Sequence, residues 1–294
     1  MNFNNYSVNP NKDFKLSKIN TSSGKKQTKK KGLKEELLGY FEEIAKLQNK
    51  LFAENRQSLL IILQGMDSAG KDGTIKAIMK GLNPQGVLVH SFKHPSIIEL
   101  EHDFLWRHAI KLPEHGQITI FNRSHYENVL ISKVHPEIVL SERLPGIDSI
   151  DKVDKKFWSM RYKQINYFEE MNTQNGTCVL KFFLHISKKE QCNRFLDRIE
   201  NKEKHWKFTS EDIAERRFWN SYEDAYEQTF KHTSTKTAPW YIIPADDKPF
   251  AHLLVCKIIL EKLTNMNPSF PTINNTEIEL MQQAKKELIE ESGH

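Results

Sequence analysis

Residues 58–74 read SLLIILQGMDSAGKDGT, and this stretch decides the fold. Its first seven residues form an apolar run that predicts a buried strand, and a glycine-rich loop follows directly. Gly65 and the pair Gly70-Lys71 match G-x-x-x-x-G-K, a pattern whose backbone N–H groups hold phosphate at the start of a helix. The strand before the loop and the helix expected after it supply the required context. The alternative is a plain glycine turn with an exposed lysine.

Further strand and helix patterns alternate on both sides of this loop. Apolar runs predict four more strands, at residues 87–92, 118–122, 177–186 and 240–244. Apolar residues at helical spacing predict a helix directly after the loop and further helices over residues 33–51, 96–112, 151–172 and 250–265. The alternation indicates an α/β fold with a five-stranded parallel sheet covered by helices on both faces, in three layers.

Charge divides the chain into unequal parts. The net charge is +5, but residues 1–34 hold nine lysines and one aspartate, so the remainder carries −3. We therefore predict a basic, flexible N-terminal arm over residues 1–32, which is either simply solvated or helps to attract a polyanion. The main domain is expected over residues 33–266, followed by a tail at 267–294 that is partly helical.

Several classes of protein are excluded by composition. No run of 18 apolar residues occurs, so we expect no membrane partner. The N-terminal residues MNFNNYSVNPNKDF lack the apolar core of a signal sequence, and we expect a cytoplasmic protein. The three cysteines are scattered and form no C-x-x-C pair, which predicts reduced thiols rather than a zinc site or a disulfide framework.

Two carboxylates lie inside the predicted loop, although a phosphate site should repel anions. Asp72 stands in the first helical turn, where an acid meets the positive end of the helix dipole. Asp67 has no such explanation, because a carboxylate ~4 Å from a phosphate oxygen costs on the order of 4 kcal/mol at an effective dielectric near ~20. Mg²⁺ reverses that sign by bridging carboxylate and phosphate oxygens, so Asp67 is the predicted metal ligand. The other predicted phosphate-binding positions of the loop are Gly65, Ser68, Ala69, Gly70, Gly73 and Thr74.

The strand at 118–122 ends in the sequence FNRSHYEN. P-loop enzymes commonly place a metal-binding aspartate at this point, but here the residue is the neutral Asn122, followed by Arg123. The metal-binding role is thereby left to Asp67, and a cation stands at the sheet edge where ligands bind in open α/β folds. Arg123 could instead be a surface ion-pair residue.

A polar segment between the last two strands is predicted to form a lid, residues 190–234. Arg194 and Arg198 lie four apart and therefore share one face of a helix. Guanidinium groups on a hinged segment suit phosphoryl transfer, because they neutralise charge on the transferred group and exclude water. The alternative is a solvated helix with ordinary i,i+4 charges.

Five separated motifs resemble the polyphosphate kinase 2 family over roughly residues 13–263. They are GMDSAGKDGTIK, NPQGVLVHSFKHPS, FNRSHYE, HWKFTSEDI and STKTAPWYIIPADDK, in that order. The resemblance implies a P-loop kinase fold similar to thymidylate kinase, with a helical lid. It also implies Mg²⁺-dependent, reversible transfer of phosphate between inorganic polyphosphate and nucleotides, and a homo-oligomer, dimer or tetramer. Functional residues carried over are Asp67, Lys71, Asp72, Asn122, Arg123, Arg194 and Arg198.

The match departs from the commonest family pattern within one motif. Many members read FDRSWYN, whereas this chain has Asn122 in place of the aspartate and Glu127 in place of the last asparagine. The version FNRSHYE is similar to the subgroup that phosphorylates AMP as well as ADP. A neutral Asn122 agrees with that reading, since it adds no negative charge near an acceptor phosphate.

The predicted reaction is transfer from polyphosphate to AMP or ADP, giving ADP or ATP, with adenine or guanine nucleotides as partners. The predicted catalytic residues are Asp67, Lys71, Arg123, Arg194 and Arg198, and Glu127 joins the nucleotide-binding set. A chain of phosphates needs repeated cations, and the predicted polyphosphate channel is formed by Lys93, Arg107, Lys133, Lys204 and Lys207.

Two other functions compete with this one. An ATP-dependent nucleoside monophosphate or small-molecule kinase would need the same loop and lid. A polyanion-binding module with an inactive loop is supported only by the basic arm, and no nucleic-acid-reading element is recognisable, so we expect no nucleic-acid partner. Deletion of residues 1–31 is expected to spare most of an enzyme's turnover but to abolish binding by such a module.

Overall fold

The computed structural model describes residues 3–9, 14–24 and 30–292. Within these residues, five parallel strands form one sheet in the order β2-β3-β1-β4-β5. The strands are β1 (Ser58–Gly65), β2 (Val87–Ser91), β3 (Ile118–Asn122), β4 (Thr177–His185) and β5 (Trp240–Pro244). The α/β fold and the five-stranded parallel sheet predicted from the sequence are confirmed.

The central strand β1 explains why the sequence around the loop is so apolar. All eight of its residues are buried, since neighbouring strands flank it and helices cover both of its faces. Parallel strands end at the same edge of a sheet, so the loop after β1 and the residue that follows β3 lie close together. The backbone N–H of Arg123 donates to the carbonyl oxygen of Leu63 over 3.1 Å.

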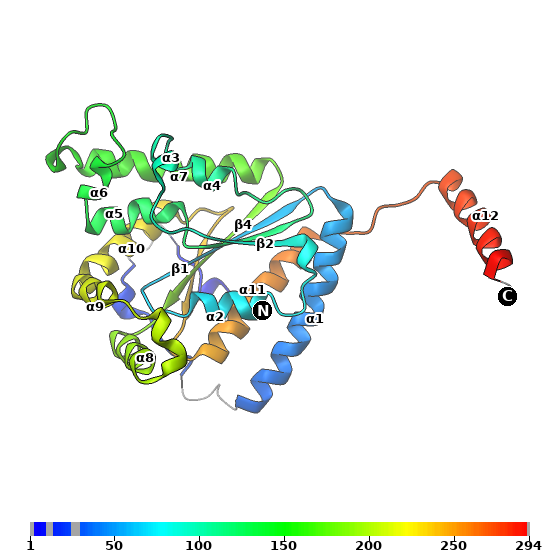
Figure 1. Cartoon of the computed structure of the whole chain (residues 1–294), viewed down its shortest axis with the longest axis horizontal. Coiled ribbons are helices and arrows are strands. Elements are labelled where there is room, and N and C mark those ends of the chain that lie inside the picture. Colours follow the sequence, from blue (N-terminus) through cyan, green and yellow to red (C-terminus); the bar gives the residue numbers. More distant parts are fainter. Residues whose placement is uncertain (1–2, 10–13, 25–29, 293–294) are drawn as a thin grey trace.

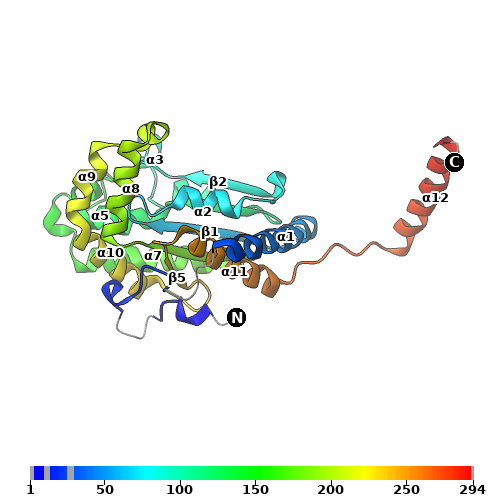
Figure 2. The same cartoon turned by 90° about the horizontal axis from the view of Figure 1, so that it is seen from below.

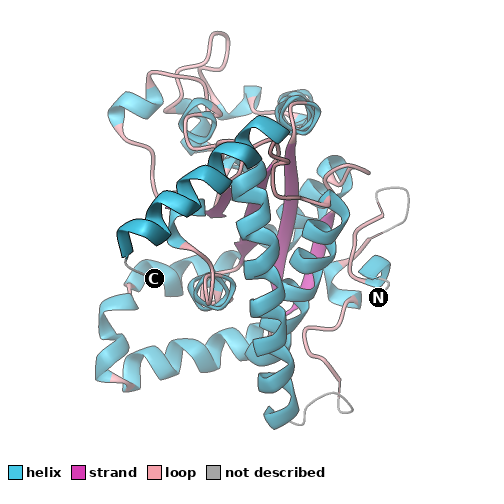
Figure 3. Ribbon diagram, turned by 90° about the vertical axis from the view of Figure 1, so that its right-hand side faces the viewer, coloured by secondary structure: helices cyan, strands magenta, loops and turns pink. Residues whose placement is uncertain are grey.

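Helices cover the sheet in two layers (Figures 1 and 3). One layer holds α1 (Lys30–Glu54), α2 (Lys71–Ile78) and α11 (Lys248–Met266). The other holds α5 (Ile131–Val134), α7 (Lys155–Gln174) and α10 (Trp219–Thr233), with α6 (Glu137–Leu140) beside α5. The segment predicted as a lid is largely helical: α8 (Lys188–Glu200), the 3₁₀ turn η6 (Lys202–Lys207) and α9 (Ser210–Glu215), followed by α10.

The single helix predicted over residues 96–112 is wrong. The structure has two short helices instead, α3 (Ile97–Leu100) and α4 (Trp106–Ala109). Between them the carboxylate of Asp103 accepts a hydrogen bond of 2.9 Å from the backbone N–H of Leu105. Such a local side-chain bond offers the backbone an alternative to the helix, so the chain turns at this point.

The prediction of a flexible arm is wrong for its described parts. Residues 3–9 extend the sheet beyond β5, where the N–H of Ile242 donates to the carbonyl of Tyr6 over 2.7 Å. Leu16 is fully buried, and its N–H donates to the Glu227 carboxylate over 2.8 Å. The prediction rested on the number of lysines, and it overlooked the apolar and hydrogen-bonding residues that lie between them. The lysines at 25, 26 and 29 lie outside the described residues.

The C-terminal tail ends in a helix that stands away from the rest of the chain (Figures 1 and 2). After α11 ends, Asn267 adopts a left-handed conformation with φ of 50°, and an irregular stretch leads to α12 (Asn275–Ser292). Every residue of α12 is exposed. In the described part of the chain, no helix combines the length and apolar character needed to cross a membrane.

Candidate active site

The glycine-rich loop after β1 has the geometry of a phosphate cradle. Gly70 has φ of 102° and Ser68 has φ of 61°, and α2 begins at Lys71. This sequence of left-handed residues turns the loop around the N-terminus of α2, where free N–H groups and the helix dipole attract anions. The Lys71 ammonium folds back onto the loop carbonyls, at 2.8 Å from the Gly65 oxygen.

Gly65 cannot carry a side chain in this arrangement. A Cβ placed there would lie 2.9 Å from the Cβ of Ala69 and 2.9 Å from the carbonyl oxygen of Leu184. Both distances are shorter than van der Waals contact, and the backbone oxygen belongs to the neighbouring strand. The first glycine of the motif is therefore required by close packing between the loop and β4.

Each acid of the loop is paired with a cation. The Asp67 carboxylate lies 3.2 Å from the Arg123 guanidinium. Asp72 accepts hydrogen bonds from the Asn122 amide at 3.0 Å and from the Lys207 ammonium at 3.3 Å. Partial burial opposes ionisation of Asp72, but these two hydrogen bonds outweigh it and lower its pKa. The two acids thus hold Arg123 and Lys207 in place beside the loop.

Arg123 occupies a strained position between its acidic neighbours. Its φ of 62° lies in the left-handed region, which is unusual for a residue with a side chain and stores backbone strain beside the P-loop. Its pKa is raised, first by the negative charge of Glu127 and then by Asp67. In contrast, burial and the nearby Arg123 charge lower the pKa of Lys71, although Asp67 and Glu127 oppose this.

Two cavities meet at Arg123 and Glu127. The larger has a volume of about 570 Å³ and lies beside the ends of β2 and β3, with Phe92, Leu100 and Phe104 in its wall. The smaller, about 310 Å³, lies between the P-loop and helices α9 and α10. The residues common to both walls are His94, Arg123, Glu127 and Ile131.

The structure places Arg194 beneath the P-loop rather than in a cavity. Its guanidinium donates to the carbonyls of Ser68 at 3.0 Å, Ala69 at 2.7 Å and Ala245 at 2.5 Å, and pairs with Glu190 at 2.8 Å. The side chain is only 7% exposed. With its donors occupied, it cannot reach a transferred phosphate in this conformation, so the predicted location is wrong. Instead it holds the loop from behind.

Arg198 lies on α8, in the segment predicted as a lid, and lines neither of the two cavities. It pairs with Asp212 at 3.0 Å, and both Asp212 and Gln191 line the smaller cavity. The Gln191 amide donates to the backbone carbonyl of Asp67 over 3.0 Å, which joins α8 to the P-loop. The sequence analysis missed Gln191, although its position one turn before Arg194 places it on the same helix face.

The five cations predicted to line the polyphosphate channel lie in different parts of the structure. The five channel cations do not form one row: Lys93 and Arg107 line the larger cavity, while Lys207 approaches the P-loop. Lys204 pairs with an acid of its own lid segment at 2.6 Å, and Lys133 lies 3.8 Å from an acid of α10.

The structure also shows the surroundings of Thr74 and adds two tyrosines to the site. The Thr74 side chain is buried and its hydroxyl donates to the Gly70 carbonyl over 3.1 Å, within the first turn of α2, and its contact with phosphate stays a prediction. Tyr222 and Tyr226 line the smaller cavity and were not predicted. Their spacing of four, which places both on one face of α10, was the only available signal.

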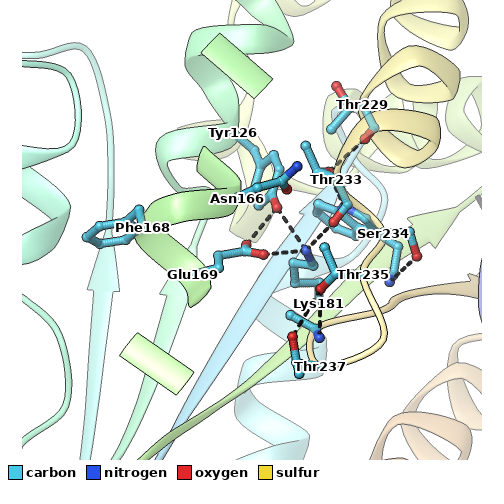
Figure 4. Close-up of polar contacts among 12 residues, drawn as sticks. Tyr126, Asn166, Phe168, Glu169, Lys181, Thr229, Thr233, Ser234, Thr235 and Thr237 are labelled. Carbon is cyan, nitrogen blue, oxygen red and sulfur yellow. Dashed lines mark hydrogen bonds and ion pairs between the residues drawn. The ribbon is translucent and has the colours of Figure 1, made fainter. Parts of the chain in front are cut away.

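A buried polar network supports the segment after β3 (Figure 4). The Lys181 ammonium, in the middle of β4, donates to Glu169 of α7 at 2.5 Å, to the Tyr126 hydroxyl at 3.0 Å and to the Thr233 carbonyl at 2.7 Å. The Tyr126 hydroxyl in turn donates to Glu169 over 2.6 Å. Burial alone would raise the pKa of Glu169, but the charge of Lys181 outweighs it and the pKa is lowered. The network ties β4, α7 and α10 to the turn that carries Glu127.

The acidic residues near the P-loop are suitable ligands for a magnesium ion. Among residues the structure describes, no three histidine, cysteine or carboxylate side chains form a complete protein metal site. Mg²⁺ does not need one, since one or two carboxylates and substrate phosphates usually hold it. Asp67, Glu127 and Asp212 line the same cavity, and burial and the Asp67 charge raise the pKa of Asp212. The charge of one carboxylate thus disfavours ionisation of another in this cavity, and carboxylate oxygens are ligands that suit a hard cation such as Mg²⁺.

The comparison with known families agrees with this geometry. The family profile described as "Polyphosphate kinase 2 (PPK2)" matches residues 27–271. The chain belongs to the polyphosphate kinase 2 family. The resemblance inferred from five motifs is thereby confirmed, and the polyphosphate kinase 2 profile ends before α12.

Individual polyphosphate kinase 2 relatives are similar over most of their length. An ADP-polyphosphate phosphotransferase of Rhodopseudomonas palustris is 47% identical over 84% of this chain and 85% of its own. An AMP/ADP-polyphosphate phosphotransferase of Meiothermus ruber is 43% identical over 78% of this chain and 80% of its own. The crystal structure of polyphosphate kinase 2 from Arthrobacter aurescens has a TM-score of 0.83 at 36% identity and covers 95% of both chains.

Proposed function

We propose that this protein transfers the terminal phosphate of inorganic polyphosphate to AMP or ADP. The observation that carries the proposal is the wall shared by the two cavities, where Arg123 and Glu127 stand beside the P-loop. A donor and an acceptor phosphate entering from the two sides would meet at this wall. Phosphoryl transfer depends mainly on such positioning and on neutralisation of charge.

The donor end of the reaction is assigned to the P-loop. Lys71, Arg123 and Lys207 are paired with loop carbonyls and acids, and an incoming phosphate oxygen replaces those partners. Arg198 adds a lid cation, while Arg194 keeps the loop in shape. Mg²⁺, held by Asp67, would neutralise the phosphate oxygens and offset the repulsion from the carboxylates.

The acceptor nucleotide is assigned to the larger cavity. Its wall combines aromatic and apolar side chains, which suit a purine of adenine or guanine, with the cations Lys93 and Arg107. These two residues, predicted above for the polyphosphate channel, are here assigned to the acceptor phosphate instead. Asn122 is neutral and donates to Asp72, so it adds no negative charge where the acceptor phosphate would lie. A second phosphate pKa near ~6 leaves the acceptor largely ionised at pH 7, so no strong general base is required.

The direct test offers AMP and ADP separately, each with Mg²⁺ and long-chain polyphosphate, and separates the products by chromatography. Formation of ADP and ATP is expected. Turnover of AMP with ATP but never with polyphosphate would instead identify an ATP-dependent kinase. Omission of Mg²⁺ with added chelator is expected to stop the reaction.

The role of Asp67 is tested by Asp67→Asn, which keeps the size of the side chain and removes its charge. Turnover should fall by about 100-fold or more, because the metal loses its protein ligand. Asp148→Asn is the matched control, since Asp148 is exposed, forms an ion pair with Lys152 and lines neither cavity. Near-normal turnover of Asp67→Asn at saturating Mg²⁺ would disprove the proposed metal ligand.

A further inference from the structure

The projecting helix α12 has no role in the site described above. It lies beyond the last residue of the family profile, and all of its residues are exposed. The preceding stretch exposes further apolar side chains, with Phe270 at 61% and Ile273 at 49%. This stretch is anchored where the Gln57 amide donates to the carbonyl of Met266 over 3.1 Å. From that anchor, residues 267–292 form an arm that extends away from the sheet (Figure 2).

One face of α12 is suited to burial. Its large apolar residues fall on one half of the helix and are 41–64% exposed; they are Ile278, Leu280, Met281, Leu288 and Ile289. Most helical stability in proteins comes from packing of such an apolar face, and in α12 this face is exposed. The helix also carries five glutamates and two lysines, a net charge of −3.

A matching surface lies on the outer side of α7. Met160, Tyr167 and Met171 are spaced by seven and four residues, so they form one stripe along the helix. Their exposures are 44%, 67% and 55%, although the opposite side of the same helix is buried against the sheet. The exposed charges of α7 are Lys155, Lys156, Lys163 and Glu170, a net charge of +2.

We propose that α12 of one copy of this chain docks on the α7 stripe of a second copy, in a reciprocal exchange of C-terminal arms. Both surfaces are amphipathic and opposite in charge, so one can cover the other. A symmetric exchange forms the same contact twice and closes a dimer. Pairing of two α12 helices is disfavoured, because each has glutamates at both ends and either orientation brings acids together.

The first test measures molar mass by light scattering after gel filtration, over a range of protein concentrations. The unaltered protein should be a dimer or larger assembly. Met281→Glu on the apolar face of α12 and Tyr167→Glu on α7 should each shift the assembly toward half its mass. Gln283→Glu, on the polar face of α12, introduces the same charge and should leave the mass unchanged. Far-UV circular dichroism and turnover with AMP confirm that each variant is folded.

The second test separates docking on a second copy from docking on the same chain. A mixture of Met281→Glu and Tyr167→Glu proteins retains one intact contact per pair, because the unaltered α12 of one meets the unaltered α7 of the other. The mixture should therefore recover part of the dimer that neither variant forms alone. Failure to recover it, an unaltered protein that is monomeric at all concentrations, or variants with unchanged mass would each overturn the proposal.

Discussion

Replacement of Lys181 by methionine tests whether Lys181 and Glu169 form a charged ion pair in the core. Lys181 is fully buried, and its ammonium is the common donor to Glu169, Tyr126 and Thr233. Removal of one partner of a buried ion pair leaves the other charge uncompensated, which costs about 3–5 kcal/mol. We expect Lys181→Met to lower the free energy of unfolding by that amount in a urea titration followed by circular dichroism.

The matched variant removes both charges. Lys181→Met with Glu169→Leu replaces the pair by apolar side chains of similar size, a change that is often neutral or stabilising. Stability should therefore recover in part but not in full, because the Tyr126 hydroxyl and the Thr233 carbonyl stay buried without these partners, at a cost of about 1–3 kcal/mol each. The kcat of the double variant should still fall, with KM little changed, because the Tyr126 hydroxyl loses both partners that fix the turn bearing Glu127.

Two results would refute this reasoning. If Lys181→Met lowers the free energy of unfolding by less than about 1 kcal/mol, Glu169 is not left as an unpaired buried charge in that variant. If the folded double variant has a normal kcat, the network stabilises the core but does not position the turn after β3.

Three further predictions concern stability and the loop. Leu16→Ala should cost about 2–5 kcal/mol in chemical denaturation, because a fully buried side chain leaves a cavity; an unchanged midpoint would show that the N-terminal segment is detached. Gly65→Ala should abolish phosphoryl transfer, since the new Cβ meets Leu184 backbone at 2.9 Å; an active variant would contradict the close packing. Burial lowers the pKa of His108 well below its usual 6.5. Below pH 6.5 the unfolded chain therefore binds a proton at His108 that the folded chain does not bind. The free energy of unfolding should thus fall on acidification, by up to about 1.4 kcal/mol per pH unit, and should not depend on His108 above pH 6.5. His108→Phe should flatten that slope, and an identical pH profile would exclude the assignment.

The sheet and the loop could be predicted because their signals are local. A strand buried on both faces reads as a continuous apolar run, and the glycine pattern specifies the turn after it within ten residues. The bounds of β3 and β5 match the predicted ranges of 118–122 and 240–244 for the same reason. Resemblance to a family then supplied the reaction, which composition alone did not contain.

Features that were missed depend on contacts between distant parts of the chain. Arg194 has helical spacing from Arg198, but its orientation is decided by carbonyls of the P-loop and of Ala245. Leu16 lies among lysines, and only the packed structure shows its burial beside Glu227. The prediction that loss of residues 1–31 would spare most of the turnover is therefore replaced by an expected loss of stability.

The junction at Ala245 and Asp246 has a consequence for synthesis on the ribosome. Arg194 bonds to both of their carbonyls, and the Asp246 carboxylate accepts from the Thr21 hydroxyl at 2.7 Å and from the Ser187 N–H at 2.8 Å. A nascent chain that has exposed its P-loop still lacks these partners until β5 has emerged. The contacts that support the P-loop from behind are thus completed only when more than four-fifths of the polypeptide has been translated, so a chain that stops before residue 245 lacks them.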